Sequence, residues 1–171
     1  CIRDRYCKGN WYFKMIYEDV SEFANELQSN NSLIGLDLGT KTIGVAVSDI
    51  ILSVATPIKT IKRKKFSIDS DQLLGIISIK NCCGIVFGLP KNMDGSEGPR
   101  AQATRAFARN FSKKTTLPIS FWDERLSTVA AEKALLEADT TRKRRAEVID
   151  HVAAAYILQG FLDRLKILDN C

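Results

Sequence analysis

The chain has 171 residues, of which 45% are hydrophobic and 26% charged, so it has room for one domain with a buried core but not for two of ordinary size. Its formal net charge of +5 favours an acidic partner such as nucleic acid. No apolar run approaches the roughly 20 residues of a membrane-spanning helix, and we therefore expect no membrane partner.

Near the start of the chain, one short segment has the period of an amphipathic helix. Between Glu18 and Gln28, four apolar residues fall at positions i, i+3, i+4 and i+7, namely Val20, Phe23, Ala24 and Leu27. A polar run from Gln28 to Ser32 follows. We therefore predict an N-terminal extension over residues 1–31 and a separate domain over residues 32–168.

Residues 33–50, LIGLDLGTKTIGVAVSDI, predict a strand, a tight turn and a second strand. Asp37 lies inside the first strand among aliphatic residues, where burial of a charge is costly without a partner or a metal ion. Gly39 follows, and its missing side chain allows a ligand or another backbone to approach closely. The alternative is a surface hairpin in which Asp37 only caps a turn.

The rest of the chain alternates between strand and helix patterns. The predicted strands are Ser53–Ile58, Gly84–Leu89 and Pro118–Trp122. Four helices are predicted. The first is capped by Asp69 or Ser70, the second begins at Pro99, the third runs from Ser127 or Thr128 to Ala138, and the fourth runs from Ala146 to Leu165. This order indicates an α/β fold whose sheet is antiparallel over its first three strands and parallel beyond them, five strands in all.

Five cysteines form no regularly spaced pairs: Cys1, Cys7, Cys82, Cys83 and Cys171. An odd count without such pairs is typical of a reducing compartment rather than of a disulfide framework. Because the sequence begins with Cys rather than Met, an upstream targeting segment can have been lost. We expect a cytoplasmic protein or, if a transit peptide preceded this sequence, a plastid or mitochondrial one.

Acidic residues on separate elements form the strongest candidate site. Asp37 lies in the first strand, and Asp123 and Glu124 end the last strand, where ligands gather in open α/β sheets. Asp150 lies in the final helix, on a face shared with Ala154, Ile157 and Phe161. Inward-facing acids repel one another unless a cation joins them, and hard oxygen ligands suit Mg²⁺ or Mn²⁺. The alternative is that each acid caps a helix or pairs with an arginine.

The long loop of residues 88–100 places Lys91, Arg100 and free backbone N–H groups near a helix N-terminus, which predicts an anion site. The alternative is an ordinary solvated loop. A basic run, Arg142–Arg145, follows the predicted helix that ends at Ala138, and together with the acids it favours a phosphate-backbone ligand. We interpret His151, the only histidine, as a hydrogen-bonded helix residue rather than a proton shuttle.

Four motifs in this order resemble the YqgF (RuvX) family of Holliday-junction-resolvase-like proteins, viewed as pre-16S rRNA nucleases. The motifs are GLDLGTKTIGVAVSD (35–49), GIVFGLPKNMDGSEGPRA (84–101), DERLST (123–128) and IDHVAAAYILQGFLD (149–163). The resemblance covers roughly residues 33–165 and implies a ribonuclease-H-like fold. One departure is DERLST where DERLTT is common in the family, and serine keeps the hydroxyl group.

The resemblance implies a metal-dependent endonuclease that acts on structured nucleic acid and processes pre-16S-type rRNA. It implies Asp37, Glu124 and Asp150 as catalytic acids, Asp123 as an additional metal ligand, and two Mg²⁺ or Mn²⁺ ions. The residues expected to hold phosphates are Lys41, Lys91, Arg100, Arg125, Arg142, Lys143, Arg144 and Arg145. RNA, and with it ribosomal precursor particles, is the expected partner, with branched DNA as the alternative. The oligomeric state stays open.

Three other functions fit parts of the pattern. A Holliday-junction or branched-DNA resolvase needs the same acids on a different substrate. A non-catalytic RNA-binding assembly factor needs the fold without turnover, although retention of all the acids argues against it. An actin-like ATPase also carries an Asp-x-Gly-Thr loop, but it needs a second such lobe, for which this chain is too short.

Overall fold

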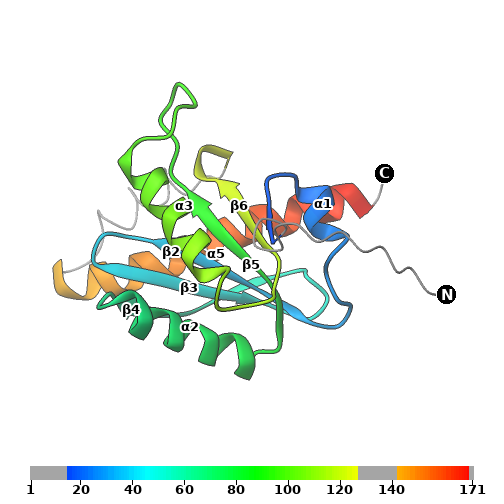
Figure 1. The fold of residues 1–171 in the computed structure, drawn as a ribbon, viewed down its shortest axis with the longest axis horizontal. Coiled ribbons are helices and arrows are strands. Elements are labelled where there is room, and N and C mark those ends of the chain that lie inside the picture. The colour runs from blue at the N-terminus through cyan, green and yellow to red at the C-terminus, as the bar shows by residue number, and fades with distance from the viewer. Residues whose placement is uncertain (1–14, 127–141, 170–171) are drawn as a thin grey trace.

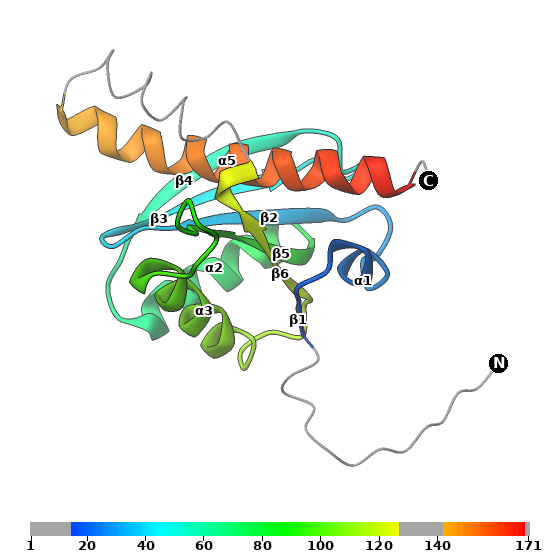
Figure 2. The same ribbon diagram turned by 90° about the horizontal axis from the view of Figure 1, so that it is seen from above.

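The computed structural model describes residues 15–126 and 142–169, and in the second range it describes side chains from residue 151 onward. A mixed sheet lies between two helical layers (Figures 1 and 2). Helix α5 (Arg142–Asp169) covers one face, and α2 (Phe66–Ile79) and α3 (Pro99–Phe111) cover the other. Within the described ranges, no helix is both long enough and apolar enough to cross a bilayer.

The sheet has six strands. They are β1 (Ile16–Tyr17), β2 (Ser32–Leu38), β3 (Thr42–Ser48), β4 (Ala55–Lys62), β5 (Cys82–Leu89) and β6 (Ile119–Asp123). Their spatial order is β1-β6-β5-β2-β3-β4. The pairs β2–β3 and β3–β4 are antiparallel, whereas β2–β5, β5–β6 and β6–β1 are parallel. The predicted change from antiparallel to parallel pairing is confirmed.

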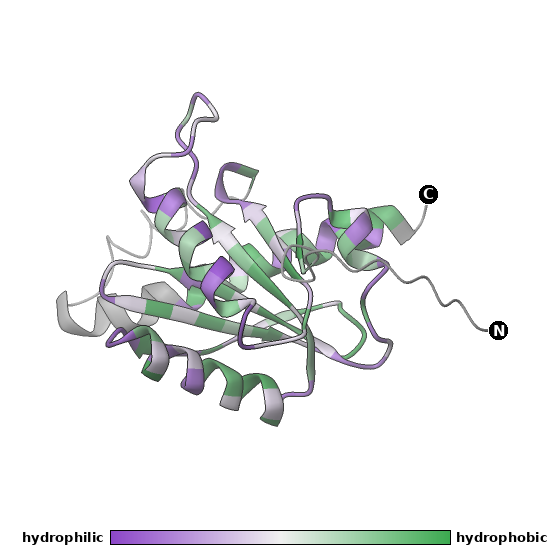
Figure 3. Cartoon of the chain, viewed as in Figure 1, coloured by the Kyte–Doolittle hydropathy of each residue, from purple (hydrophilic) through white to green (hydrophobic). Residues whose placement is uncertain are grey.

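Each face of the sheet has its own hydrophobic core, because successive side chains of a strand point to opposite faces. On β2, Leu36 belongs to the core beneath α2 and α3, whereas Leu33 packs with Ile157 and Phe161 of α5. The central strands are coloured mostly as hydrophobic in Figure 3. Both faces of β2 and β5 are buried, so their residues form continuous apolar runs rather than an alternating pattern.

The prediction of five strands is wrong, because residues before Ser32 add a sixth. Strand β1 pairs in parallel with β6, with Ile16 beside Ile119. Helix α1 (Val20–Ala24) is shorter than the predicted Glu18–Gln28 helix, and its Phe23 is fully buried. The Phe23 ring meets that of Phe161 edge-on, with centroids 5.3 Å apart. These contacts bear on the predicted boundary at residue 32, which we return to below.

One strand and one helix extend further than predicted. The third strand was predicted to end at Ile58, but β4 continues to Lys62 as an edge strand with exposed lysines. The final helix begins at Arg142 rather than at the predicted Ala146, which agrees with the high helix propensity of arginine and lysine. The predicted helix from Ser127 or Thr128 to Ala138 lies outside the described residues.

Candidate active site

A row of residues crosses the sheet at Asp37. The register aligns Asp37 with Gly44 of β3, and Gly44 with Thr60 of β4. On the other side, Leu36 pairs with Phe87, so the next position of β5 is Gly88, which in turn pairs with Trp122 of β6. Asp37 is only 5% exposed, which confirms that this carboxyl group is buried within an apolar strand. It lies at the carboxyl end of β2, where open α/β sheets bind ligands.

Gly88 gives the carboxyl group of Glu124 its place beside this row. Residues Glu124–Leu126 form a 3₁₀ turn directly after β6. If residue 88 carried a Cβ, that atom would lie 2.8 Å from Oε1 of Glu124 and 2.4 Å from Cδ1 of Ile157. The Glu124 carboxyl group therefore lies over Gly88 on the α5 face of the sheet. The odd-numbered residues of β2, including Asp37, face the same side.

Helix α5 closes over this part of the sheet through small residues. A Cβ on Gly35 would lie 2.7 Å from Cβ of Leu158 and 3.1 Å from the backbone oxygen of Ala154. Ala154 and Ile157 are fully buried, as is Phe161, so the helix face predicted to carry Asp150 does pack against the sheet. Asp150 itself lies within α5, one turn before Ala154, and its side chain is outside the described residues.

Asp123 has a partner of its own in Arg125. Its carboxyl group accepts hydrogen bonds from the Arg125 guanidinium, 2.6 Å from Nη2 and 3.0 Å from Nε, and from the Arg125 backbone N–H. The bond from the Arg125 side chain lowers the pKa of Asp123, and the charge of Lys91 lowers it further. In the β5–β6 register Asp123 lies beside Leu89, so by alternation it faces α3 rather than α5.

The cationic residues expected to hold phosphates occupy several positions around the carboxyl ends of the strands. Lys41 is exposed in the β2–β3 turn, and Arg100 is exposed in the first turn of α3. Lys91 is half-buried, just after β5. Arg125 is engaged with Asp123. The residues Arg142, Lys143, Arg144 and Arg145 form the first turn of α5, and their side chains are outside the described part.

Two further residues, His151 and Arg63, shape the site; only the first was identified from the sequence. Nδ1 of His151 lies 3.2 Å from Oγ1 of Thr60, in agreement with its interpretation as a hydrogen-bonded helix residue. Arg63 was not identified from sequence, yet its Nη1 donates to the Gly39 backbone oxygen at 2.7 Å and so fixes the turn after Asp37. The sequence signal that could have identified Arg63 is its position within a basic run, Lys59 to Lys65.

The donor set around Gly88 fits a hard divalent cation. Carboxylate oxygens are the ligands that Mg²⁺ and Mn²⁺ prefer, and the missing Cβ of Gly88 lets the Glu124 carboxyl group lie close against the sheet. Among the described side chains, no three acids, cysteines or histidines gather closely enough to hold a metal ion by themselves. Asp37 and Glu124 therefore need a third oxygen donor, and Asp150 is the residue of α5 that the sequence offers.

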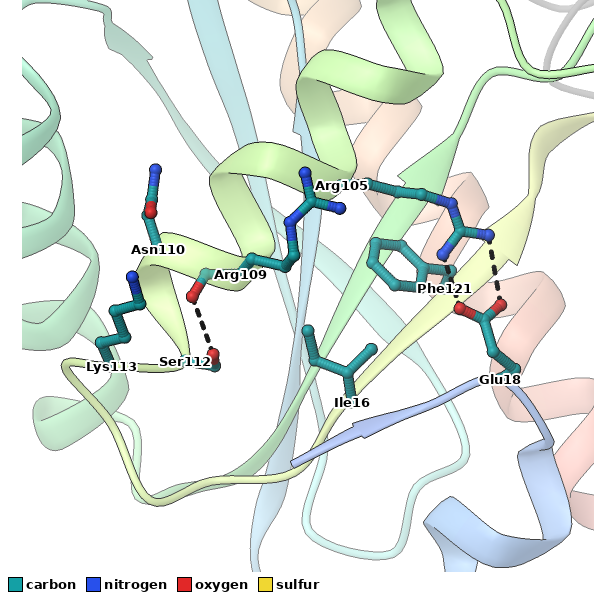
Figure 4. A pocket seen from close by; sticks show the side chains of 8 residues that line it. All are labelled: Ile16, Glu18, Arg105, Arg109, Asn110, Ser112, Lys113 and Phe121. Atoms are coloured by element: carbon teal, nitrogen blue, oxygen red, sulfur yellow. Dashed lines mark hydrogen bonds and ion pairs between the residues drawn. The ribbon is translucent and has the colours of Figure 1, made fainter. Parts of the chain in front are cut away.

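A separate pocket of about 450 Å³ lies on the other side of the sheet, between α3 and β1 (Figure 4). Its floor is formed by Ile16 and Phe121, and Arg105 lies over the Phe121 ring at 4.7 Å. Arg105 also pairs with Glu18 and Glu97, and these bonds raise its pKa. None of the predicted acids with a described side chain (Asp37, Asp123 and Glu124) lines this pocket, so it is distinct from the site at Glu124 and Gly88.

Comparison with protein families identifies relatives over most of the chain. The family model described as "RuvX: Holliday junction resolvase" matches residues 31–164. A protein of Ruegeria pomeroyi is 70% identical over 154 residues, covering 90% of this chain and 100% of the relative. A protein of Roseobacter denitrificans is 67% identical over 156 residues, covering 90% and 96%. Both relatives carry the name "Putative pre-16S rRNA nuclease".

Solved structures give a more distant likeness in fold. A Thermus thermophilus RuvC in complex with a Holliday junction substrate aligns with a TM-score of 0.52 and 11% identity, over 80% of this chain and 96% of that one. A second RuvC structure from the same organism aligns with a TM-score of 0.50 and 12% identity. At this level of identity the likeness establishes the ribonuclease-H-like fold alone, as the sequence resemblance implied.

Proposed function

The chain belongs to the RuvX family of nucleases, and from this premise we propose that it is a divalent-metal-dependent endonuclease that cleaves structured RNA, with precursor 16S rRNA as its substrate. The observation that carries the proposal is the position of the Glu124 carboxyl group over Gly88, the residue of β5 that follows Phe87, just as Asp37 follows its partner Leu36 in β2. Asp37 is buried in the neighbouring strand, and the Glu124 carboxyl group lies over Gly88.

The acids would work as a metal site at the carboxyl ends of β2 and β6. Asp37 and Glu124 supply oxygen ligands, and Asp150 on α5 supplies the third carboxyl group. Two Mg²⁺ or Mn²⁺ ions bound there would activate a water molecule and stabilise the leaving oxygen of an in-line displacement. Burial of Asp37 at the carboxyl end of β2 favours this role, because open α/β sheets bind ligands at that end of their strands.

The surrounding cations would hold the RNA backbone against the acids. Lys41, Lys91 and Arg100 come from the turns and the helix start around the carboxyl ends of the strands. In this role Asp123 positions Arg125, whose guanidinium it binds with two oxygens, rather than binding a metal ion itself. The basic first turn of α5, Arg142–Arg145, extends the path for the phosphate backbone.

The choice of RNA as substrate rests on the relatives. The two reported relatives named for pre-16S rRNA share two thirds or more of their residues with this chain over nearly their whole length. Ribosomal precursor particles are then the natural partner. The description of the family model favours branched DNA as the second candidate substrate.

A cleavage assay tests the proposal. The purified chain is incubated with a precursor 16S rRNA fragment, a four-way DNA junction and a single strand, each with Mg²⁺, Mn²⁺ or EDTA. We expect metal-dependent cleavage of the RNA, loss of this activity in Asp37→Asn, and retention of RNA binding in that variant. Cleavage by Asp37→Asn at the wild-type rate would contradict the assignment, and preferential cleavage of the junction would make DNA the substrate.

A further inference from the structure

Met93 lies at the tip of the loop between β5 and α3, and its side chain is 93% exposed. The other residues from 91 to 98 are polar or glycine, so Met93 is the one apolar side chain in this segment. The loop projects beyond the carboxyl end of the sheet (Figure 1). It begins two residues after Gly88, over which the Glu124 carboxyl group lies.

The tip of the loop is a defined turn rather than a loose connection. The backbone N–H of Gly95 donates to the Asn92 oxygen at 2.9 Å, so Met93 occupies the first corner of a β-turn. Gly95 has a φ of 88°, which glycine adopts without strain. Across the turn, Asn92 N–H donates to the Ser96 backbone oxygen at 2.9 Å, and its side-chain amide donates to the Ser96 hydroxyl at 2.8 Å.

Hydrogen bonds at Asp94 hold the turn from within. Oδ1 of Asp94 accepts from the Ser96 hydroxyl at 2.6 Å and from the Ser96 backbone N–H at 2.9 Å, and these bonds lower the pKa of Asp94. The loop therefore holds the Met93 backbone in place at neutral pH while leaving the side chain in solvent. An apolar side chain held in this way is pre-organised for contact, because little backbone entropy remains to be lost on binding.

Both sides of the loop are tied to neighbouring elements. The Met93 backbone oxygen lies 3.5 Å from Nη1 of Arg125, the residue that follows Glu124 and pairs with Asp123. At the other end, Glu97 accepts from Arg105 at 2.6 and 2.7 Å. The position of Met93 is thus set relative to β6 and α3, and through Arg125 it is linked to the turn that carries the Glu124 carboxyl group.

We propose that Met93 is a wedge residue that inserts between two bases of the RNA beside the cleavage site and opens the stack there. Single exposed apolar residues are common, and Ile79, at 79% exposure, is an ordinary example on the surface of α2. Met93 differs because it is held at the corner of a turn, with its backbone oxygen beside Arg125, in the loop that also carries Lys91 and leads to Arg100. Apolar side chains that enter a base step while neighbouring cations bind phosphates unstack and kink nucleic acid.

This inference rests on the proposed nuclease function and refines it. RNA is recognised mainly where bases are unstacked, so a wedge at the active site would select a helix end, bulge or loop over a regular duplex. It would also align the exposed phosphodiester with the acids. Met93 would accordingly be a positioning residue rather than a catalytic one.

A fluorescence experiment tests the wedge without requiring cleavage. The probe is a stem–loop RNA with 2-aminopurine next to the position that the wild-type chain cleaves, bound by the Asp37→Asn variant so that it stays intact. Fluorescence of 2-aminopurine rises when the base is unstacked. We compare Asp37→Asn alone with the same variant carrying Met93→Ala, Met93→Leu or, as a matched control for an exposed apolar residue, Ile79→Ala.

The wedge predicts that binding increases the fluorescence severalfold, that Met93→Ala abolishes most of this increase, and that Met93→Leu and Ile79→Ala preserve it. In the Asp37→Asn background, Met93→Ala should weaken RNA binding by no more than roughly 150-fold, because one inserted side chain contributes no more than a typical stacking contact. An equal fluorescence increase in Met93→Ala would overturn the proposal. The proposal would also fail if Met93→Ala weakened the binding of ribosomal particles but not that of the RNA alone, because Met93 would then be a protein contact.

The same experiment separates this inference from the proposed function. If the Met93-dependent signal appears but Asp37→Asn still cleaves RNA, the metal-site assignment fails and the wedge stands. If Asp37→Asn is inactive and binds RNA with no Met93-dependent signal, the wedge fails and the nuclease assignment stands.

Discussion

Oε1 of Glu124 lies in the space that a side chain on Gly88 would need, 2.8 Å from the position of a Cβ atom at residue 88. The glycine is therefore not a packing accident within β5. It allows an acid from the end of one strand to reach across the neighbouring strand, toward Asp37 on the next. Because Ile157 approaches Gly88 even more closely, to 2.4 Å from the same Cβ position, the glycine also sets the distance between α5 and the sheet.

Gly88→Ala should lower both stability and cleavage. The added methyl group would lie 2.4 Å from Cδ1 of Ile157, and overpacking of this kind costs about 1–3 kcal/mol. It would also displace Glu124, so kcat should fall more than the RNA affinity. The matched control is Gly75→Ala in α2, where nothing lies within 4 Å of the new Cβ atom and where alanine is the better helix former. Urea denaturation and cleavage assays of both variants check this, and a fully active Gly88→Ala would refute the crowding.

Phe23→Ala should destabilise the whole domain by about 3–5 kcal/mol, as expected for loss of a fully buried phenylalanine. The Phe23 ring packs on Phe161 and lies near Gly84, where a Cβ atom would come within 2.7 Å of it. The sequence-based boundary at residue 32 predicts instead that changes before this residue leave the domain unaffected. A single denaturation curve with an unchanged midpoint would favour that boundary, whereas a lowered midpoint would extend the domain to include α1.

The pair of Asp123 and Arg125 should contribute stability that depends on pH. The bond from Arg125 lowers the pKa of Asp123, so the folded state favours the charged carboxylate. This contribution is present above the ordinary carboxyl pKa of 3.8 and is lost as the pH falls through the lowered pKa of the folded state. Asp123→Asn should therefore be less stable than wild type at pH 7, and the difference should disappear under strongly acidic conditions. A difference that is constant with pH would mean that the pair contributes nothing by its charge.

Neutralising Arg142, Lys143, Arg144 and Arg145 together should weaken RNA binding across sequences, because cationic side chains that contact phosphates contribute to affinity whatever the base sequence. Each lost phosphate contact should reduce the slope of log affinity against log salt by about 0.7 for a single strand. Neutralising Arg109 and Lys113, which line the pocket between α3 and β1, is the matched control and should leave the slope unchanged. An unchanged slope in the fourfold variant would show that the first turn of α5 does not touch RNA.

The parts of this fold that could be predicted are those whose sequence signal is local. Asp37 was found because aliphatic neighbours surround a charge, and the start of α3 because Pro99 can open a helix. Strand β1 could not be found, because two residues carry no period and pair only through contact with distant Ile119. Gly88 offered a signal that was not used, since a glycine inside a strand often marks close approach of another group.

The site was predicted as a set of acids, but sequence could not separate their roles. Asp123 and Glu124 are adjacent and both acidic, so both were assigned as metal ligands. The structure distinguishes them: Asp123 is held by Arg125, whereas Glu124 lies over Gly88. Alternation of strand side chains places neighbours on opposite faces, and the residue at which β6 ends decides which acid turns toward α5.

The most direct test of the account is a thermal melt of the wild type, Asp37→Asn and Asp150→Asn, each with and without Mn²⁺. A ligand bound by the folded state alone raises the melting temperature by mass action. We expect Mn²⁺ to raise the melting temperature of the wild type but not that of either variant. Without metal, both variants should be at least as stable as the wild type, because one of the crowded charges is gone. A wild-type melting temperature that is the same with and without Mn²⁺ would contradict a metal site shared by these acids.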